Sequence, residues 1–160
     1  MRNILTIASV IAGLGIVMAQ MADRIAPASA SANSVQADTR SLSISRNAAG
    51  HFVTEGQIDG QRIDFMVDTG ASVVALNATS AARFGLRPSR SDYRVTVTTA
   101  NGAIKAAPAR IAIDLGGLVV RDVDAMVLPD AALSDNLLGL SFLSRLKRFE
   151  YASGRLVLEQ

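Results

Sequence analysis

The chain has 160 residues, of which 49% are hydrophobic and none is cysteine, and its formal net charge is +2. This length favours a single folded domain. The lack of cysteine excludes a disulfide framework, a thiolate metal site and a cysteine nucleophile. The only histidine, His51, cannot build a multi-histidine zinc site, and a serine–histidine–aspartate triad would rest on it alone. We therefore expect neither a metal nor a cofactor, and carboxylates remain as the groups for acid–base chemistry.

Aromatic residues make up only 4% of the chain, which is too few for base-stacking platforms. The basic residues are scattered except for a short cluster at residues 145–148, which is more typical of a solvated helix face than of a nucleic-acid footprint. We therefore expect no nucleic-acid partner.

The N-terminal segment differs in composition from the rest of the chain. No charged residue occurs between Asn3 and Ala22, and Arg2 precedes this apolar run. About 20 apolar residues can cross a bilayer as a helix, so residues 1–22 are expected to form a membrane anchor or a signal segment. Residues 28–30 (Ala-Ser-Ala) have the pattern of a signal cleavage site. Because the positive end stays inside, the remainder should lie on the periplasmic side of the inner membrane, either anchored or released.

The next segment, residues 23–45, is rich in alanine and serine and lacks hydrophobic periodicity, which predicts a flexible tether. The folded domain is therefore expected to span residues 46–160. Its pattern of many short strands and hairpins, with a short helix near the C-terminus, predicts a mainly-β barrel or sandwich.

The expected elements follow one another with clear turn signals. Pro108 favours an edge or bulge position in its strand, and Ser141 is expected to cap the second helical segment. Four connections carry preferred turn dipeptides: Asp59-Gly60, Asn101-Gly102, Gly116-Gly117 and Ser153-Gly154. The expected strands cover residues 51–58, 61–67, 73–76, 93–99, 104–115 and 118–128 and a hairpin over 151–158, and the expected helical segments cover residues 80–84 and 141–146.

A carboxylate stands at the end of one apolar strand, in the segment 65–72. Apolar residues alternate with others up to Val67, so Asp68 enters apolar surroundings, where a charge is costly unless it is paired, hydrogen-bonded or used. Thr69 can donate a hydroxyl hydrogen bond, and Gly70 lets a second backbone approach closely. By itself, an Asp-Thr-Gly sequence more often opens a simple Asx-turn, and the rest of the chain has to decide between these interpretations.

Three parts of the chain together resemble the retropepsin-like aspartic proteases of clan AA, in particular their bacterial membrane-anchored branch. Residues 67–72 match the catalytic motif of that family. Residues 136–139 match its second motif, in which two apolar residues and a glycine pack beneath the active-site loop. Residues 98–105 correspond to the flap that covers the substrate. The resemblance spans residues 45–160 and implies a closed β-barrel that forms one half of a homodimeric acid protease.

The resemblance assigns a role to each matching residue. Asp68 is the expected catalytic residue of an aspartic endopeptidase, which acts on a polypeptide substrate. Ala71 has no hydroxyl to donate to the ionised Asp68, so we expect activity in weak rather than strong acid. The expected supports of the active-site loop are Thr69, Gly70, Ala71, Leu137, Leu138 and Gly139, and the expected flap residues are Ala100, Asn101, Gly102 and Ala103.

Aspartic proteolysis needs two carboxylates that share one proton, because one activates a water while the other protonates the substrate carbonyl. The chain has one Asp-Thr-Gly, so the second carboxylate is expected from Asp68 of another copy across a two-fold axis. The strand at residues 154–158 is expected to join the dimer interface, or else to complete the sheet of the monomer. The later acids are expected in turns or on the surface: Asp114, Asp122, Asp124 and Asp135.

Three other functions compete with this interpretation. A non-catalytic dimeric module could bind an extended peptide with the same fold, and Asp68 would then be a structural residue. A phosphate-binding loop can also contain Asp-Thr-Gly, but it needs parallel βαβ units and further acidic metal ligands, whereas hairpins dominate here. The third alternative is a structural β-domain that faces the cell envelope and whose main function is its membrane anchor.

Overall fold

The computed structural model describes residues 40–99 and 102–160, which belong to one compact unit, Asp38–Gln160. The expected anchor or signal segment, residues 1–22, lies outside the described residues, as does the expected tether up to residue 39. Ala100 and Asn101 of the expected flap also lie outside them. In the described part of the chain, no helix has the length and apolar character needed to cross a membrane.

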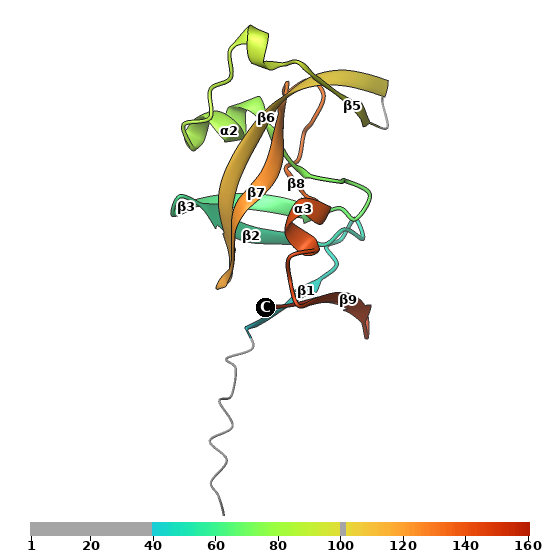
Figure 1. Ribbon diagram of the computed structural model, residues 1–160. Helices are drawn as coiled ribbons and strands as arrows, with labels where there is room; N and C mark the ends of the chain where they lie inside the picture. The colour runs from blue at the N-terminus through green and yellow to red at the C-terminus, as the bar shows by residue number, and fades with distance from the viewer. Residues whose placement is uncertain (1–39, 100–101) are drawn as a thin grey trace, which may run out of the picture. The chain divides into compact units, whose positions relative to one another are not determined.

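Strands make up most of the described chain, which confirms the predicted mainly-β class (Figure 1). The helical elements are short: α2 (Ala78–Arg83), α3 (Leu140–Leu143) and the 3-10 turn η1 (Arg90–Asp92). The strands are β1 (Ser41–Ser45), β2 (Val53–Ile58), β3 (Gln61–Val67), β4 (Val74–Asn77), β5 (Val95–Thr99), β6 (Gly102–Leu115), β7 (Leu118–Leu128), β8 (Leu137–Leu138), β9 (Arg148–Ala152) and β10 (Arg155–Glu159).

Six of the described strands close into a barrel. The larger sheet runs in the order β2-β3-β8-β4-β7-β6-β5, and β2 also pairs with β6 through Gln57 and Asp114. Gly56 permits this closure, because a Cβ atom there would lie 2.9 Å from Leu115 Cδ1 and 3.2 Å from the carbonyl oxygen of Asp114. The closed barrel predicted from the resemblance is therefore confirmed.

The turns have the backbone that their sequences require. Asp59 and Gly60 have φ angles of 50° and 74°, and Ser153 and Gly154 have angles of 50° and 79°. Two successive residues with positive φ are the signature of the type I′ hairpin, whose twist matches that of the flanking strands. These dipeptides fix the register in which strand residues face the core. Ile63 and Phe65 of β3 are accordingly buried, while Asp64 between them is exposed.

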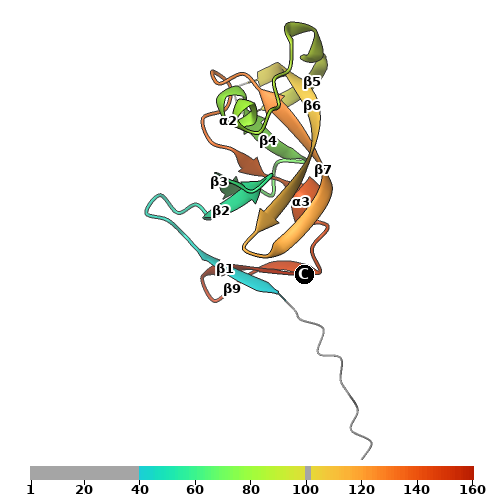
Figure 2. The same cartoon turned by 90° about the vertical axis from the view of Figure 1, so that its left-hand side faces the viewer.

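The predicted end of the tether is wrong, because Ser41–Ser45 forms strand β1 and pairs with β10. Leu42 and Ile44 alternate with serines, which is a strand pattern, and Ile44 is buried in the core. The second sheet has the order β1-β10-β9, so β10 is its central strand. Figures 1 and 2 both place this sheet at the end of the barrel opposite the β5–β6 hairpin.

The predicted cap of the second helical segment is also wrong. Helix α3 begins after Gly139 and has no side-chain cap. The hydroxyl of Ser141 instead accepts a hydrogen bond from the Val74 N–H at 3.0 Å and donates one to the Asp124 carbonyl at 2.7 Å. Ser141 thus joins β4 to β7, a tertiary role that its sequence position does not reveal.

Pro108 has the edge position predicted for it. It lies opposite Met126 of β7, two residues beyond Ala106, where the pairing of β6 with β5 ends at Val95. Among the described strands, β6 has a partner on only one side at this point. The missing N–H of proline therefore costs no ladder hydrogen bond.

Candidate active site

Asp68 directly follows β3, at the point where β3 runs parallel to the short strand β8. The register pairs Met66 with Leu137 and Val67 with Leu138. The backbone N–H of Asp68 extends this pairing by donating to the Leu138 carbonyl at 3.2 Å. The two motifs singled out in the sequence therefore lie side by side, although the chain between them forms most of the barrel.

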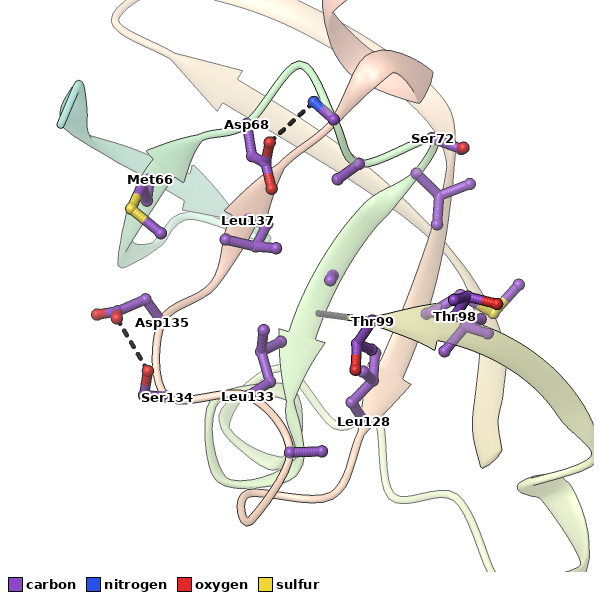
Figure 3. A pocket seen from close by; sticks show the side chains of 17 residues that line it. Met66, Asp68, Ser72, Thr98, Thr99, Leu128, Leu133, Ser134, Asp135 and Leu137 are labelled. Atoms are coloured by element: carbon purple, nitrogen blue, oxygen red, sulfur yellow. Dashed lines mark hydrogen bonds between the residues drawn. The ribbon is translucent and has the colours of Figure 1, made fainter. Parts of the chain in front are cut away.

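The Asp68 carboxylate is held by its own loop. Its Oδ1 accepts a hydrogen bond from the Gly70 N–H at 2.8 Å, which is the local geometry of an Asx-turn (Figure 3). The Asp68 carbonyl in turn accepts from the Ala71 N–H at 3.2 Å. A Cβ atom on Gly70 would lie 3.1 Å from Asp68 Oδ1 and would crowd the carboxylate. The simple turn interpretation of the motif is therefore correct for the local backbone, and it leaves the second oxygen free to face the cavity described below.

Gly139 lies against the active-site loop so closely that only glycine fits. A Cβ atom there would lie 2.2 Å from the carbonyl oxygen of Val73 and 2.7 Å from that of Ala71. The two N–H groups after Gly139 donate to loop carbonyls, Leu140 to Ala71 at 2.8 Å and Ser141 to Ser72 at 3.0 Å. Leu138 is fully buried beside them. This segment supports the loop, as the resemblance implies.

Asn136, the first residue of the second motif, is a buried polar residue to which the sequence analysis assigned no role of its own. Its side-chain oxygen accepts from the Asn77 N–H at 3.2 Å, and its side-chain nitrogen donates to the Asp64 carbonyl at 3.3 Å. Its own carbonyl accepts from the Met66 N–H at 2.9 Å. Asn136 thereby ties β3, β4 and the start of β8 together beneath the loop.

A cavity of about 700 Å³ opens in front of Asp68 (Figure 3). Its walls come from the active-site loop, from β5, from β7 and from the segment between β7 and β8. Among the described lining residues, Asp68 and Asp135 are the ionisable ones. The largest of the other lining side chains are apolar: Met66, Val97, Met126, Leu128, Leu133 and Leu137. A cavity of this size and character suits an extended chain with apolar side chains.

The cavity wall between β7 and β8 is anchored by Asp130. Its carboxylate accepts hydrogen bonds from the backbone N–H of Thr79 at 2.9 Å and from the Thr79 hydroxyl at 2.8 Å. The backbone hydrogen bond is the main cause that lowers the pKa of Asp130, and the hydroxyl adds to it. The interaction attaches this wall to the first turn of α2.

The structure brings some of the predicted site residues to the cavity and places others behind it. Asp68, Gly70, Ala71 and Leu137 line the cavity, whereas Leu138 and Gly139 support the loop from behind. Thr69 is exposed on the loop. Of the described flap residues, Gly102 and Ala103 are exposed and do not line the cavity; Val97, Thr98 and Thr99 do so instead.

Several lining residues were missed by the sequence. Met66 could have been found, because it precedes Asp68 by two positions on a strand and so shares its face. Leu133 and Asp135 carried no such signal, since they lie in an irregular segment between β7 and β8. Within residues 40–99 and 102–160, no three histidine, aspartate or glutamate side chains are grouped so that they could hold a metal ion.

The fold and the motifs match known proteins. The family model described as "gag-polyprotein putative aspartyl protease" matches residues 54–145. The crystal structure of a retropepsin-like aspartic protease from Rickettsia conorii is 35% identical, with a TM-score of 0.68, and the match covers 76% of this chain and 92% of that chain. EIAV protease in complex with the inhibitor HBY-793 is 17% identical, with a TM-score of 0.52 over 63% of this chain and 92% of that chain, and so shares the fold.

Two curated relatives, both described as uncharacterised, are longer than this chain. A protein of a Sinorhizobium species is 41% identical over 110 residues, which are 68% of this chain and 47% of that protein. A protein of Rickettsia prowazekii (strain Madrid E) is 36% identical over 118 residues, which are 72% of this chain and 49% of that protein. The chain thus spans about half the length of these relatives. Because the family model covers more than half of the chain and the Rickettsia conorii fold matches most of it, the chain belongs to the retropepsin-like family of aspartic proteases.

Proposed function

We propose that this chain is an aspartic endopeptidase that hydrolyses peptide bonds with Asp68. One observation carries the proposal: the carboxylate at the family's catalytic position, held by the Gly70 N–H, faces a largely apolar cavity of about 700 Å³. The cavity is lined by residues from several strands, and its volume is sufficient for several side chains of an extended polypeptide. A structural β-domain has no need for such a cavity beside a carboxylate.

The second carboxylate of the mechanism comes from Asp68 of another copy in a homodimer. The other acid of the described cavity lining, Asp135, is separated from Asp68 by Leu137 (Figure 3). At about 4 Å and an effective dielectric constant near 20, two ionised carboxylates would repel each other by about 4 kcal/mol. The pair therefore shares one proton, so that one member activates a water while the other protonates the substrate carbonyl.

The exposed groups around the loop support this dimer. Thr69 is exposed, and its hydroxyl makes no hydrogen bond within the described part of its own chain. It is therefore available to the loop of a second copy. The N–H of Val67 donates to the Phe52 carbonyl at 2.9 Å. This hydrogen bond joins the end of β3 to an aromatic patch that consists of Phe52 and Tyr151.

That patch favours β9 as the strand at the interface. The rings of Phe52 and Tyr151 lie 5.9 Å apart, Tyr151 is 59% exposed, and Val53 is 40% exposed. Strand β10, which the sequence suggested for this role, already pairs with β1 and β9 on its two edges. Strand β9 keeps one edge without a partner among the described strands, so we assign the interface to this edge and its aromatic side chains.

The β5–β6 hairpin serves as the flap of the proposed enzyme. Val97, Thr98 and Thr99 already line the cavity, and the Thr99 hydroxyl donates to the Gly102 carbonyl at 2.9 Å across the hairpin. Closure of this hairpin over a bound peptide excludes bulk water and leaves the attacking water between the two carboxylates.

The decisive experiment compares the wild-type chain with Asp68→Asn in a peptide-library digest from pH 3 to pH 8, with and without pepstatin. The wild type should cleave peptides, and the substitution should lower kcat/KM by about 10³-fold or more. The variant should keep its circular dichroism spectrum and its oligomeric state, because asparagine retains the Asx-turn. Persistent cleavage by the variant would reject the mechanism. Binding without cleavage by the wild type would favour the non-catalytic peptide-binding module.

The location proposed for the enzyme is the periplasmic side of the inner membrane, with residues 1–22 as a single-pass anchor. The uncharged run from Asn3 to Ala22 behind Arg2 supports it. Carbonate-washed membranes should retain the full chain, and Leu14→Arg should release it. A soluble periplasmic product that begins near residue 31 would instead establish a cleaved signal.

A further inference from the structure

A second cavity, of about 250 Å³, adjoins the cavity in front of Asp68. They share part of one wall, because Met66 and Asp135 line both of them. His51 and Asp64 line the second cavity as well. A peptide that lies over Asp68 therefore has room to place a side chain past Met66 in this outer space.

The shared wall changes from apolar to acidic between the cavity in front of Asp68 and the outer cavity. Next to Asp68, β3 and β8 present the apolar pair Met66 and Leu137. One step outward, the hydrogen bond from the Met66 N–H to the Asn136 carbonyl continues the pairing. Asp64 and Asp135 follow, each two positions before a member of the apolar pair, and both line the outer cavity. A side chain that passes Met66 thus enters a cavity whose lining includes two carboxylates.

Asp135 has no cationic partner in the described part of the chain. Its carboxylate is exposed and accepts a hydrogen bond from the Ser134 hydroxyl at 3.0 Å. The nearest described ion pair on β3 joins Arg62 to Glu55 at 3.5 Å. His51 is the one basic residue of the two described linings, and it shares the outer cavity with Asp64 and Asp135. The described lining of the outer cavity thus holds two carboxylates and one imidazole, so the acidic groups outnumber the basic one, which favours a cation.

We propose that Asp135 selects a lysine or arginine side chain of the peptide substrate. The methylene stem of that side chain lies along Met66, and its charged head meets the carboxylate of Asp135 in the outer cavity. The inference rests on the proposed proteolysis and names the substrate class that the same site takes. Because Asp135 is exposed, we expect a preference of about three- to tenfold rather than an absolute requirement.

The test uses the full chain and pairs of peptides that differ at one position. A peptide that the wild type cleaves is scanned with lysine and with norleucine, its uncharged counterpart, at each position around the scissile bond. At one position the ratio of kcat/KM for lysine over norleucine should be about three to ten, and Asp135→Asn should bring it close to one. Asp135→Lys should reverse the preference toward glutamate. Raising the ionic strength from about 0.05 M to 0.5 M should weaken the wild-type ratio, since an exposed pair is screened.

Asp59→Asn is the matched control. It removes the same charge from the exposed β2–β3 turn, outside both cavities, and should leave the ratio unchanged. A wild-type ratio near one at every position, or an unchanged ratio in Asp135→Asn, would overturn the inference while leaving the proteolysis intact. If the wild type cleaves no peptide, the proposed function fails instead, and the same ratio is measured from dissociation constants of the lysine and norleucine peptides.

Discussion

At the residue scale, the behaviour of Asp68 depends on which hydrogen bonds its neighbours donate. The Gly70 N–H donates to Oδ1 at 2.8 Å, and glycine is needed there because a Cβ atom would crowd the same oxygen. Ala71 offers only a methyl group. Within the described residues, the carboxylate therefore accepts its hydrogen bond from the backbone. A hydroxyl introduced at position 71 would add a side-chain donor.

The variant Ala71→Ser introduces such a hydroxyl and should change the pH dependence of activity. A hydroxyl that donates to the ionised carboxylate favours the charged form, so the acidic limb of the kcat/KM profile should move to lower pH by about 0.5–1 unit. Ala71→Gly adds no hydroxyl and should leave the limb in place. The measurement is a pH profile of both variants on one peptide; a shift shared by both, or absent from an active serine variant, would contradict the argument.

At the scale of elements, the parallel contact between β3 and β8 holds the site in shape. It is short, with two paired residues on each strand, and it relies on Gly139 to bring the next backbone against the loop. Hydrogen bonds from Leu140 and Ser141 then hold the loop from behind. Such a contact tolerates little change in volume, because backbone rather than a flexible side chain faces Gly139.

The variant Gly139→Ala should therefore disturb both stability and activity. Its Cβ atom would lie 2.2 Å from the Val73 carbonyl oxygen, so the loop must move, at a cost of about 2 kcal/mol or more. Urea unfolding and peptide cleavage measure the two effects. Gly154→Ala is the comparison, since it has open space and a φ of 79°, and should cost about 1 kcal/mol without loss of activity. An active and stable Gly139→Ala protein would refute the packing argument.

Elements with strong local signals could be predicted from the sequence. The limits of β3 and β7 agree with the predicted ranges, because each strand begins after a glycine turn, β3 ends at the Asp-Thr-Gly motif and β7 ends before Pro129. Strand β1 was missed because five serine-rich residues form a strand only when β10, more than 100 positions later, lies beside them. The two hydrogen bonds of the Ser141 hydroxyl were not predicted for the same reason, since both of its partners belong to strands distant in the sequence.

The site could be predicted only where one segment carried its chemistry. Asp68, Gly70 and Gly139 were identified by motif; the Gly70 N–H donates to Asp68 and Gly139 lies against the loop, while the catalytic role of Asp68 stays a prediction. The cavity walls depend on how four segments converge, and Asp135, expected simply on the surface, lies on one of those walls. Several chain segments form the cavity together, so the hydrophobic periodicity of any one segment could not predict it.

At the scale of the whole molecule, the proposed mechanism takes one carboxylate, Asp68, from each barrel, so activity should depend on association. Tyr151→Glu places a charge on the exposed aromatic patch beside β9 and should weaken the proposed dimer by about tenfold or more, because the charge must be desolvated. Specific activity and sedimentation velocity, followed over a dilution series, measure the effect. Arg87→Glu, at an exposed position in the segment between α2 and η1, should change neither. A monomer of full specific activity would reject the shared site.

The ends of the described domain meet. The N–H of Gln160 donates to the Arg40 carbonyl at 3.0 Å, and β1 and β10 run side by side from there. A few added residues would therefore join position 160 to position 40 and make the domain a continuous ring. That ring could be reopened at the exposed Asp59-Gly60 turn as a circular permutant, which moves the free termini to the far end of a hairpin and leaves every strand pairing in place.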